Sequence, residues 1–407
     1  MGGMNQTPAS ERVHIGFFGK RNAGKSSVMN KVTGQNLAVV SDVKGTTTDP
    51  VYKAMELLPL GPVVMMDTPG IDDQGELGSL RVKKSYQVLN KTDAAVLVID
   101  GKNGMSQEDQ ALLERIKKKK IPSILVLNKR DMLEPEEVCQ TLAGLPKGYE
   151  EGRDFLWVSA REGTGIQELK ERLAVLAKPE ENQKKIIGDL LSPGDFVVLV
   201  VPIDKAAPKG RLILPQQQTI RDILDSNGIS VVVKEDRLKE TLEGLERKPR
   251  MVVTDSQVFK KVSQDTPREI LLTSFSILFA RYKGNLETTV QGARALEDLR
   301  DGDQVLISEG CTHHRQCGDI GTVKLPGWIQ KYTGKNLKFS FTSGTEFSEE
   351  LGEYSLIVHC GGCMLNEREM KYRLSCAQDQ GVPMTNYGIL IAYMNGILER
   401  SLEPFGL

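Results

Sequence analysis

The sequence lacks a dominant charge of either sign. Its 407 residues carry 53 Lys and Arg against 54 Asp and Glu, a formal net charge of −1 at pH 7. Nucleic-acid-binding domains usually present a positively charged surface. The near-equal numbers of basic and acidic residues therefore argue against a nucleic-acid-binding domain. Aromatic residues make up only 5% of the chain, which also argues against a surface on which bases stack. We therefore expect no nucleic-acid partner.

Long apolar runs are also missing. Runs such as Phe196–Pro202 are far shorter than the ~20 residues that span a bilayer. The first residues show no secretory signal pattern, and Gln6 stands where a myristoylation signal needs Ser or Thr. The six cysteines are unevenly spaced and partly clustered, which suits a reducing compartment and metal binding better than a disulfide framework. We expect a cytoplasmic protein with no membrane contact.

Short apolar runs alternate with amphipathic, helix-like segments in the first part of the chain. The runs are Val13–Phe18, Val63–Met66, Ala94–Ile99, Ser123–Leu127 and Phe155–Val158. This alternation predicts βαβ units and an α/β fold with a mostly parallel, doubly wound sheet. Ile166–Leu176 has helical spacing, and the polar segment that follows it predicts a linker. We expect a first domain over residues 1–178.

Two smaller α/β domains are expected after the linker, over residues 184–266 and 267–407. In the former, Phe196–Val201, Ile229–Val233 and Arg250–Thr254 are predicted strands, with helices at Thr219–Leu224 and Arg237–Leu245. This domain has no glycine-rich loop, which favours a scaffold or oligomerisation role. The latter is predicted to have helices over Ile270–Tyr282 and Tyr387–Leu398, and strands over Val305–Ser308 and Leu356–Val358.

A glycine-rich loop follows the first predicted strand and fits the P-loop pattern of nucleotide-binding proteins. Its predicted phosphate-binding residues are Gly19, Asn22, Ala23, Gly24, Lys25, Ser26 and Ser27. Backbone N–H groups of such a loop surround the β-phosphate at a helix N-terminus. Lys25 would then reach the β- and γ-phosphate oxygens, and the Ser26 hydroxyl would bind Mg²⁺.

The remaining motifs of a GTP site follow in order along the chain. Asp67 and Gly70 come after the second predicted strand, where an Asp supports Mg²⁺ and a Gly senses the γ-phosphate. Between them and the P-loop, Thr47 is expected to supply a second Mg²⁺ ligand. Motifs of this kind can each be ordinary turns. These three motifs and the two described next make five in the right order, and together they predict a nucleotide site.

Guanine is predicted to be the base because two further motifs close later strands. Asn128, Lys129 and Asp131 follow one strand, and the Asp131 carboxylate can accept both guanine N1–H and N2–H, which adenine does not offer. Ser159 and Ala160 follow the next strand and fit backbone support for the guanine ring. The sequence therefore predicts GTP binding and Mg²⁺-dependent GTP hydrolysis.

The first ~175 residues resemble the TrmE-Era-Septin-like branch of translation-factor-related GTPases. In that branch an apolar residue, here Ile71, replaces the usual catalytic Gln. The resemblance implies that Asn22 helps to bind a stimulating K⁺ ion and that Glu76 orients the attacking water. Asn22 can alternatively be a simple turn residue. The catalytic residues implied are thus Lys25, Asn22, Gly70 and Glu76.

Two short loops near the C-terminus gather potential metal ligands. Cys311 and His313 form one group, and after a gap of 45 residues His359, Cys360 and Cys363 form the other. Three thiolates with one His suit a tetrahedral Zn²⁺ site, and three thiolates with an open fourth position suit a [4Fe–4S] cluster. Spacing alone leaves both open. Cys139, Cys317 and Cys376 show no partner pattern and are expected to be packing residues.

The whole chain resembles the maturation GTPases of [FeFe]-hydrogenases, whose signature is C-x-H, a gap of some four dozen residues, and H-C-x-x-C. The resemblance implies that Cys311, Cys360 and Cys363 hold a [4Fe–4S] cluster, with His313 or His359 as candidate fourth ligand. It also implies a homodimer or tetramer that receives a diiron precursor, assembled with two radical-SAM maturases, and delivers it to apo-[FeFe]-hydrogenase.

Two other functions remain open at this point. An assembly-factor GTPase associated with tRNA or the ribosome could carry a structural zinc site, although the neutral charge argues against it. A redox enzyme could use a cluster for electron transfer, although the open fourth position and the lack of a flavin or nicotinamide loop argue against it.

Overall fold

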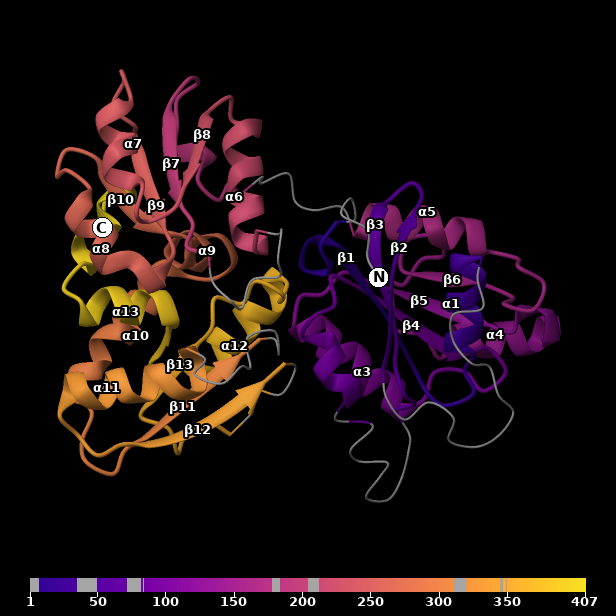
Figure 1. Ribbon diagram of the computed structural model, residues 1–407. Coiled ribbons are helices and arrows are strands. Elements are labelled where there is room, and N and C mark those ends of the chain that lie inside the picture. Colours follow the sequence, from indigo (N-terminus) through magenta and orange to yellow (C-terminus); the bar gives the residue numbers. More distant parts are fainter. Residues whose placement is uncertain are drawn as a thin grey trace. The chain divides into compact units, whose positions relative to one another are not determined.

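The computed structural model describes residues 7–34, 50–71, 82, 84–177, 184–203, 212–310, 320–344, 347–348 and 350–407. The chain divides into two compact units, residues 1–182 and 183–407. Each unit is an α/β structure (Figure 1), as the sequence predicts. The units are described separately below.

The first unit is built on one six-stranded sheet with the strand order β2-β3-β1-β4-β5-β6. Only β2 runs antiparallel to its neighbour, so the predicted parallel, doubly wound sheet is confirmed. Its elements are β1 (Val13–Phe18), α1 (Lys25–Thr33), β2 (Val51–Leu57), β3 (Gly61–Asp67), β4 (Ala94–Asp100), α3 (Gln107–Lys118), β5 (Ser123–Asn128), α4 (Pro135–Ala143), β6 (Phe155–Trp157) and α5 (Ile166–Leu176).

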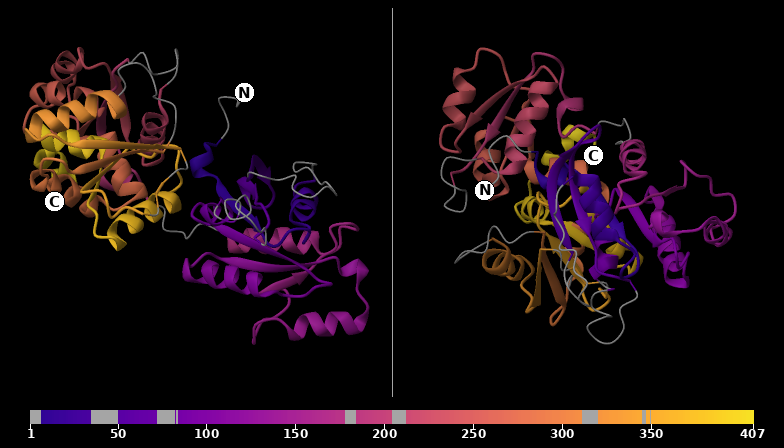
Figure 2. Two further views of the ribbon diagram at one scale, coloured as in Figure 1. Left: turned by 90° about the horizontal axis from the view of Figure 1, so that it is seen from below. Right: turned by 90° about the vertical axis from the view of Figure 1, so that its right-hand side faces the viewer.

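Both faces of this sheet are buried under helices. Phe17 of β1 packs with α1 and α5 on one face, whereas the next residue, Phe18, packs with α3 on the other. Successive side chains of a strand point to opposite faces, so continuous apolar strands such as β4 fill both cores. Figure 2 shows helices on either side of the sheet.

The second unit contains two four-stranded parallel sheets, with the orders β10-β9-β7-β8 and β12-β11-β13-β14. The elements of the first are β7 (Phe196–Val200), α6 (Leu214–Asp225), β8 (Ile229–Val233), α7 (Leu238–Gly244), β9 (Met251–Thr254), α8 (Phe259–Asp265), β10 (Leu271–Ser274) and α9 (Phe275–Lys283). Those of the second are α10 (Leu286–Arg294), β11 (Gln304–Glu309), α11 (Leu325–Thr333), β12 (Lys338–Ser343), β13 (Leu356–His359), α12 (Glu367–Asp379), β14 (Met384–Asn386), α13 (Tyr387–Met394) and α14 (Leu398–Leu402).

The two sheets of the second unit share an apolar core. One cluster contains Val198 and Val252 from the first sheet together with Val305 and Val358 from the second. Because the core is continuous, residues 183–407 form one compact unit rather than two.

Two predicted elements of this unit need correction. The segment predicted as one helix over Ile270–Tyr282 begins with strand β10, which pairs with β9, and only then becomes α9. Ser274 ends the strand and caps α9, since its hydroxyl accepts a hydrogen bond from Ile277 N at 3.3 Å. The sheet β10-β9-β7-β8 thus includes Leu271–Ser274, which lie beyond residue 266, where we expected the second domain to end. The predicted helix over Tyr387–Leu398 ends at Met394.

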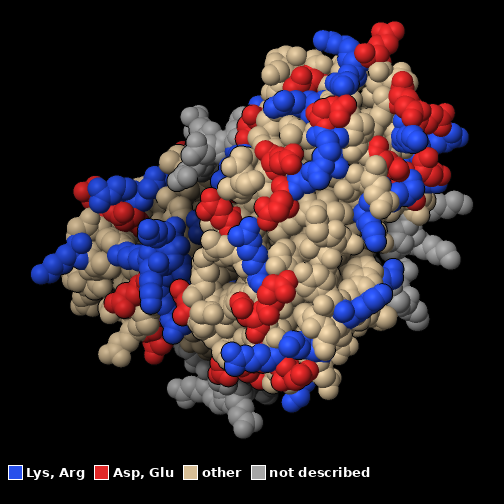
Figure 3. Space-filling view, turned by 90° about the vertical axis from the view of Figure 1, so that its left-hand side faces the viewer, with Lys and Arg blue, Asp and Glu red and all other residues tan. Residues whose placement is uncertain are grey.

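Surface charge is mixed over the face shown in Figure 3, where basic and acidic side chains are interspersed. This distribution agrees with the net charge of −1. Among the described residues, no helix is both long and apolar enough to cross a membrane.

Candidate functional site

The P-loop lies between β1 and α1 in the first unit. Gly24 directly precedes α1 with φ +92°, and a Cβ atom there would lie 2.2 Å from Asn128 Nδ2, so a glycine is required. Lys25 is buried, and its Nζ donates hydrogen bonds to the carbonyl oxygens of Gly19 at 3.0 Å and Lys20 at 2.7 Å. The ammonium group is thereby held within the loop that the sequence predicts to bind phosphate.

Ser26 and Asp67 meet at the carboxyl end of the sheet. Strands β1 and β3 are parallel neighbours with Phe17 opposite Asp67, which brings the loop after each strand to the same edge. The Ser26 hydroxyl donates a hydrogen bond to Asp67 Oδ2 at 2.5 Å. Burial raises the pKa of the Asp67 carboxyl, while the Ser26 hydrogen bond and the Lys25 charge oppose that rise. The arrangement places a hydroxyl and a carboxylate together, as a Mg²⁺ site of this type needs.

Asn128 joins the predicted base-binding segments to the P-loop. Its Nδ2 donates to Ala23 O at 3.0 Å, and its Oδ1 accepts from Ala160 N at 3.1 Å. Asp131 lies alongside, with its Oδ1 accepting a hydrogen bond from the Ser159 hydroxyl at 2.7 Å. Three loops far apart in sequence are therefore fixed to one another at one edge of the sheet.

Lys129 is the remaining member of this group, and its backbone is left-handed with φ +67°. Its Nζ lies 2.6 Å from a carboxylate oxygen of Asp100, at the end of β4. Sequence reasoning missed Asp100, although its place at the end of a strand between two motif strands was a usable signal.

Several other predicted residues belong to the same edge or fall outside the described residues. Asn22 is exposed at the turn of the P-loop and left-handed with φ +60°, a conformation that Asn tolerates well. Ser27 lies in the first turn of α1, and Gly70 follows β3. Thr47 and Glu76 lie outside the residues that the structure describes.

The cysteine loop, residues 360–365, follows β13 in the second unit. Cys360 Sγ accepts hydrogen bonds from Gly310 N at 3.0 Å and Gly362 N at 3.4 Å. Strands β11 and β13 are adjacent and parallel with Ser308 opposite His359, so Gly310 approaches Cys360 directly. Gly362 is left-handed with φ +61°, and a Cβ there would lie 2.4 Å from Met370 Sδ. The loop conformation thus depends on a glycine at this position.

These contacts fit a thiolate that binds metal. Backbone N–H groups aimed at a sulfur stabilise its negative charge, and both Cys360 and Cys363 are half-buried thiols. Cys311 and His313 lie outside the described residues, two and four positions beyond the end of β11. Within the described residues alone, no three His, Cys, Asp or Glu side chains gather around a common metal position.

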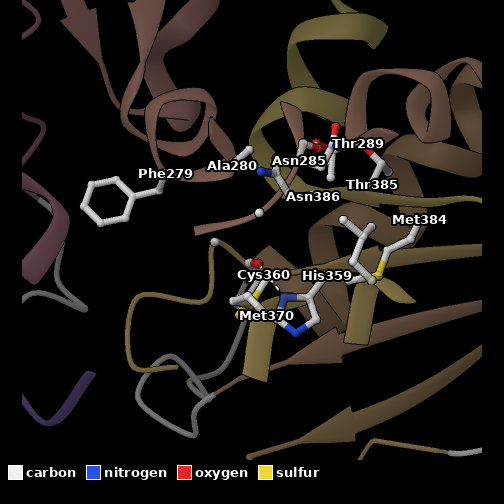
Figure 4. Close-up of a pocket in the computed structure, with 13 residues that line it drawn as sticks. Phe279, Ala280, Asn285, Thr289, His359, Cys360, Met370, Met384, Thr385 and Asn386 are labelled. Carbon is white, nitrogen blue, oxygen red and sulfur yellow. Dashed lines mark hydrogen bonds between the residues drawn. The ribbon is translucent and has the colours of Figure 1, made fainter. Parts of the chain in front are cut away.

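His359 is fully buried beside Cys360 and lines a small cavity with Met370 and Asn386 (Figure 4). Its Nδ1 lies 2.6 Å from Cys360 O, and its Nε2 lies 3.0 Å from Arg373 Nη1. A carbonyl oxygen only accepts, so Nδ1 carries the proton and Nε2 accepts from the guanidinium. His359 would have to give up one of these bonds before it could bind a metal.

Two groups of charged side chains, which contact the cysteine loop or the residue before it, were not predicted from the sequence. Arg373 and Glu369 form a buried pair, with Arg373 Nη2 to Glu369 Oε1 at 2.9 Å. Lys283, at the end of α9, donates hydrogen bonds to the cysteine loop itself. Their sequence spacing looks like that of ordinary surface charges, so only their burial distinguishes them.

The fold and this nucleotide edge define a P-loop GTPase domain followed by further α/β structure. Residues 14–129 match the family model described as 50S ribosome-binding GTPase. Residues 186–284 match the hydrogen maturase F dimerization domain, and residues 287–404 match the hydrogen maturase F tetramerization domain. The latter two together cover more than half of the chain, and the chain belongs to the hydrogen maturase F family.

Relatives outside that family are similar over a part of the chain. The tRNA modification GTPase MnmE of Acetivibrio thermocellus is 27% identical over 220 residues, which are 53% of this chain and 46% of the relative. GTPase Der of Clostridium perfringens is 29% identical over 209 residues, 46% of each chain. The chain therefore spans less than half the length of these two curated relatives. The solved structure of Aquifex aeolicus Era bound to GDP and AlF4⁻ is 20% identical, with a TM-score of 0.37 over 56% of this chain and 97% of Era.

Proposed function

We propose that this chain is a GTP-hydrolysing scaffold and carrier for the maturation of [FeFe]-hydrogenase. The observation that carries this proposal is the joining of a GTPase domain to two hydrogen maturase F domains, the second of which contains the cysteine loop. In this function Cys311, Cys360 and Cys363 hold a [4Fe–4S] cluster, and the cargo is a diiron precursor destined for apo-[FeFe]-hydrogenase.

The nucleotide part of the proposal assigns one task to each group at the edge of the first sheet. Lys25 neutralises the β- and γ-phosphates, Ser26 and Thr47 bind Mg²⁺, and Asp67 supports that ion through the Ser26 hydroxyl. Asp131 selects guanine, with its carboxylate oriented by Ser159. The chain has Ile71 where other GTPases place a catalytic Gln, so Asn22 with K⁺ and Glu76 are proposed to supply charge and water positioning.

The cluster part rests on the chemistry of the donor set. A [4Fe–4S] cluster held by three thiolates offers one iron with an exchangeable fourth ligand. The N–H groups of Gly310 and Gly362 stabilise the Cys360 sulfur as an anion. His313 or His359 could supply a fourth ligand. His359 would first have to give up its hydrogen bond with Cys360 O or with Arg373.

Partners and location follow from the same proposal. The family descriptions support self-association, and we propose a homodimer or tetramer. Two radical-SAM maturases would supply the diiron precursor in the cytoplasm.

Anaerobic reconstitution with iron and sulfide tests the proposal. The parent protein should bind about four iron and four sulfide per chain, turn brown, and restore activity to apo-hydrogenase together with the two other maturases. Cys360→Ala should lose most of the bound iron and sulfide, the brown colour and the activation of apo-hydrogenase, and should keep GTP hydrolysis. A colourless protein that instead binds one zinc per chain would contradict the proposal and favour an assembly GTPase with a structural zinc site.

A further inference from the structure

Lys283 reaches from the last turn of α9 into the cysteine loop. Its side chain is almost fully buried, at 3% exposure. Nζ donates hydrogen bonds to Leu365 O at 2.8 Å and Cys363 O at 3.1 Å, and it lies 3.5 Å from Gly362 O. The turn thus presents three carbonyl oxygens to an ammonium group that has three N–H donors.

The three carbonyl oxygens belong to the turn that carries Cys363. Within this turn Leu365 N donates to Gly362 O at 3.0 Å, and Gly362 adopts the left-handed conformation. The carbonyls of the turn converge on one point, where their partial negative charges would repel each other without a cation. Lys283 supplies that cation and so fixes the turn around Cys363.

The charge of Lys283 has a second consequence. Burying an ammonium ion away from water is costly unless opposite charge or dipoles surround it. Carbonyl dipoles provide part of this compensation, and an anionic group held by the cysteines of the same loop would provide more. A fixed cation in the loop would in turn favour negative charge on the thiolates.

Lys283 also links two regions that match different family domains. Helix α9 lies within residues 186–284, matched by the dimerization domain, and the cysteine loop lies within residues 287–404, matched by the tetramerization domain. Ile277 and Leu278 anchor α9 in the apolar cores of the unit. The position of Nζ is thus set by the packing of α9, in the region matched by the dimerization domain. Its partners belong to the cysteine loop, in the region matched by the tetramerization domain.

We propose that Lys283 is a positioning residue that holds the cysteine loop in its metal-binding conformation and offsets the negative charge of the bound cluster. The loop-fixing part concerns the metal-free chain, and the charge-offsetting part rests on the proposed function. The hydrogen bonds of Lys283 to the cysteine loop go to backbone oxygens, and its Nζ also lies 5.7 Å from the centre of the Phe279 ring. A protonated lysine has donors and no acceptor, so Lys283 acts through the loop rather than as a ligand.

Hydrogen exchange on metal-free protein tests the first part. In Lys283→Met the amide of Leu365 should exchange about tenfold faster than in the parent, because hydrogen bonds to a charged group are lost from the turn. Arg281→Met is the matched control: Arg281 lies in the same turn of α9 but pairs with Asp189, away from the cysteine loop. Equal protection of Leu365 in both variants and the parent would overturn the loop-fixing role. If Lys283→Met does not fold, Lys283→Gln carries the same comparison.

Redox titration of the reconstituted proteins, followed by electron paramagnetic resonance, tests the second part. Lys283→Met and Lys283→Gln should be harder to reduce, with the reduced-to-oxidised ratio at a fixed potential falling about tenfold, or 59 mV for one electron. Lys283→Arg and Arg281→Met should titrate like the parent. A parent that binds iron, with unchanged potentials in all variants, would overturn the charge role. A parent that binds no iron and sulfide would instead refute the proposed function, and the hydrogen-exchange result would still decide the loop-fixing role.

Discussion

Arg373 donates a hydrogen bond to His359 Nε2 at 3.0 Å, and both side chains are fully buried. Arg373 is held in turn by Glu369, at 2.9 Å, and by the carbonyl oxygen of Gly344, at 2.7 Å. His359 passes this constraint to the cysteine loop through its own hydrogen bond to Cys360 O. The network therefore fixes the start of the loop, as Lys283 fixes its end.

The first prediction concerns the stability of the metal-free protein at low pH. Burial, and then the Arg373 charge, lower the pKa of His359 from 6.5 to about 3. The unfolded chain therefore binds a proton that the folded chain does not, so stability is complete above pH 6.5 and falls as pH decreases toward 3. The loss should approach about 1.4 kcal/mol per pH unit.

Chemical unfolding of the second unit at several pH values between 7.5 and 4.5 checks this prediction. His359→Gln should show a shallower fall in stability than the parent, because Gln has no proton to gain. His14→Gln, which removes a histidine from the first unit, should leave the slope of the second unit unchanged. An identical slope in His359→Gln and the parent would contradict the prediction.

The second prediction concerns base selection. Asp131→Asn should weaken GTP binding by about 2–3 kcal/mol or more, because a charge-assisted pair of hydrogen bonds becomes mismatched. Xanthosine triphosphate, which presents an acceptor where guanine has its N2–H, should be hydrolysed better by the variant than by the parent. Steady-state rates with both nucleotides measure the switch. If Asp131→Asn hydrolyses GTP as well as the parent does, Asp131 does not read the base.

The third prediction concerns the monovalent cation. GTP hydrolysis by the parent should be several-fold faster in K⁺ than in Na⁺ at equal ionic strength, since a cation beside the phosphates offsets developing charge. Asn22→Ala should lose this difference, whereas Asn103→Ala, a change in the turn after β4, should keep it. Equal rates of the parent in both salts would refute the K⁺ role and leave GTP binding intact.

The fourth prediction concerns the cysteines. Cys311→Ala, Cys360→Ala and Cys363→Ala should each lose most of the bound iron, because two thiolates do not satisfy a cubane cluster. Cys139→Ala and Cys376→Ala are matched controls and should keep it. His313→Ala and His359→Ala should retain iron with an altered spectroscopic signature. GTP hydrolysis should survive all of these changes.

Iron content, visible spectra and hydrogenase activation measure that prediction. The decisive variant is Cys360→Ala, because its sulfur accepts hydrogen bonds from two backbone N–H groups, those of Gly310 and Gly362. Full iron content and normal activation in this variant would show that the cysteines are packing residues.

Local sequence was sufficient wherever a motif directly follows a strand. Parallel strands place their carboxyl ends at one edge of a sheet, so Gly24, Asp67 and Asn128 could be assigned to a common edge from the order of strands and motifs. The alternation of apolar runs with helix-like segments likewise predicted the parallel, doubly wound sheet, in which β1, β4 and β5 are buried. The resemblance to the family likewise rested on the two cysteine groups and their spacing, and the matching domains show the membership.

The tertiary structure decided which charges are buried. Arg373 and Glu369 lie four residues apart on α12, a spacing that is equally typical of an exposed helical pair. Lys283 ends an apolar helix as surface lysines often do, and β10 reads as part of that helix until it pairs with β9. The burial of Arg373 and Lys283, the pairing of β10 with β9 and the pKa of His359 depend on neighbours more than ten residues away in the sequence. Sequence periodicity reports only on neighbours along the chain.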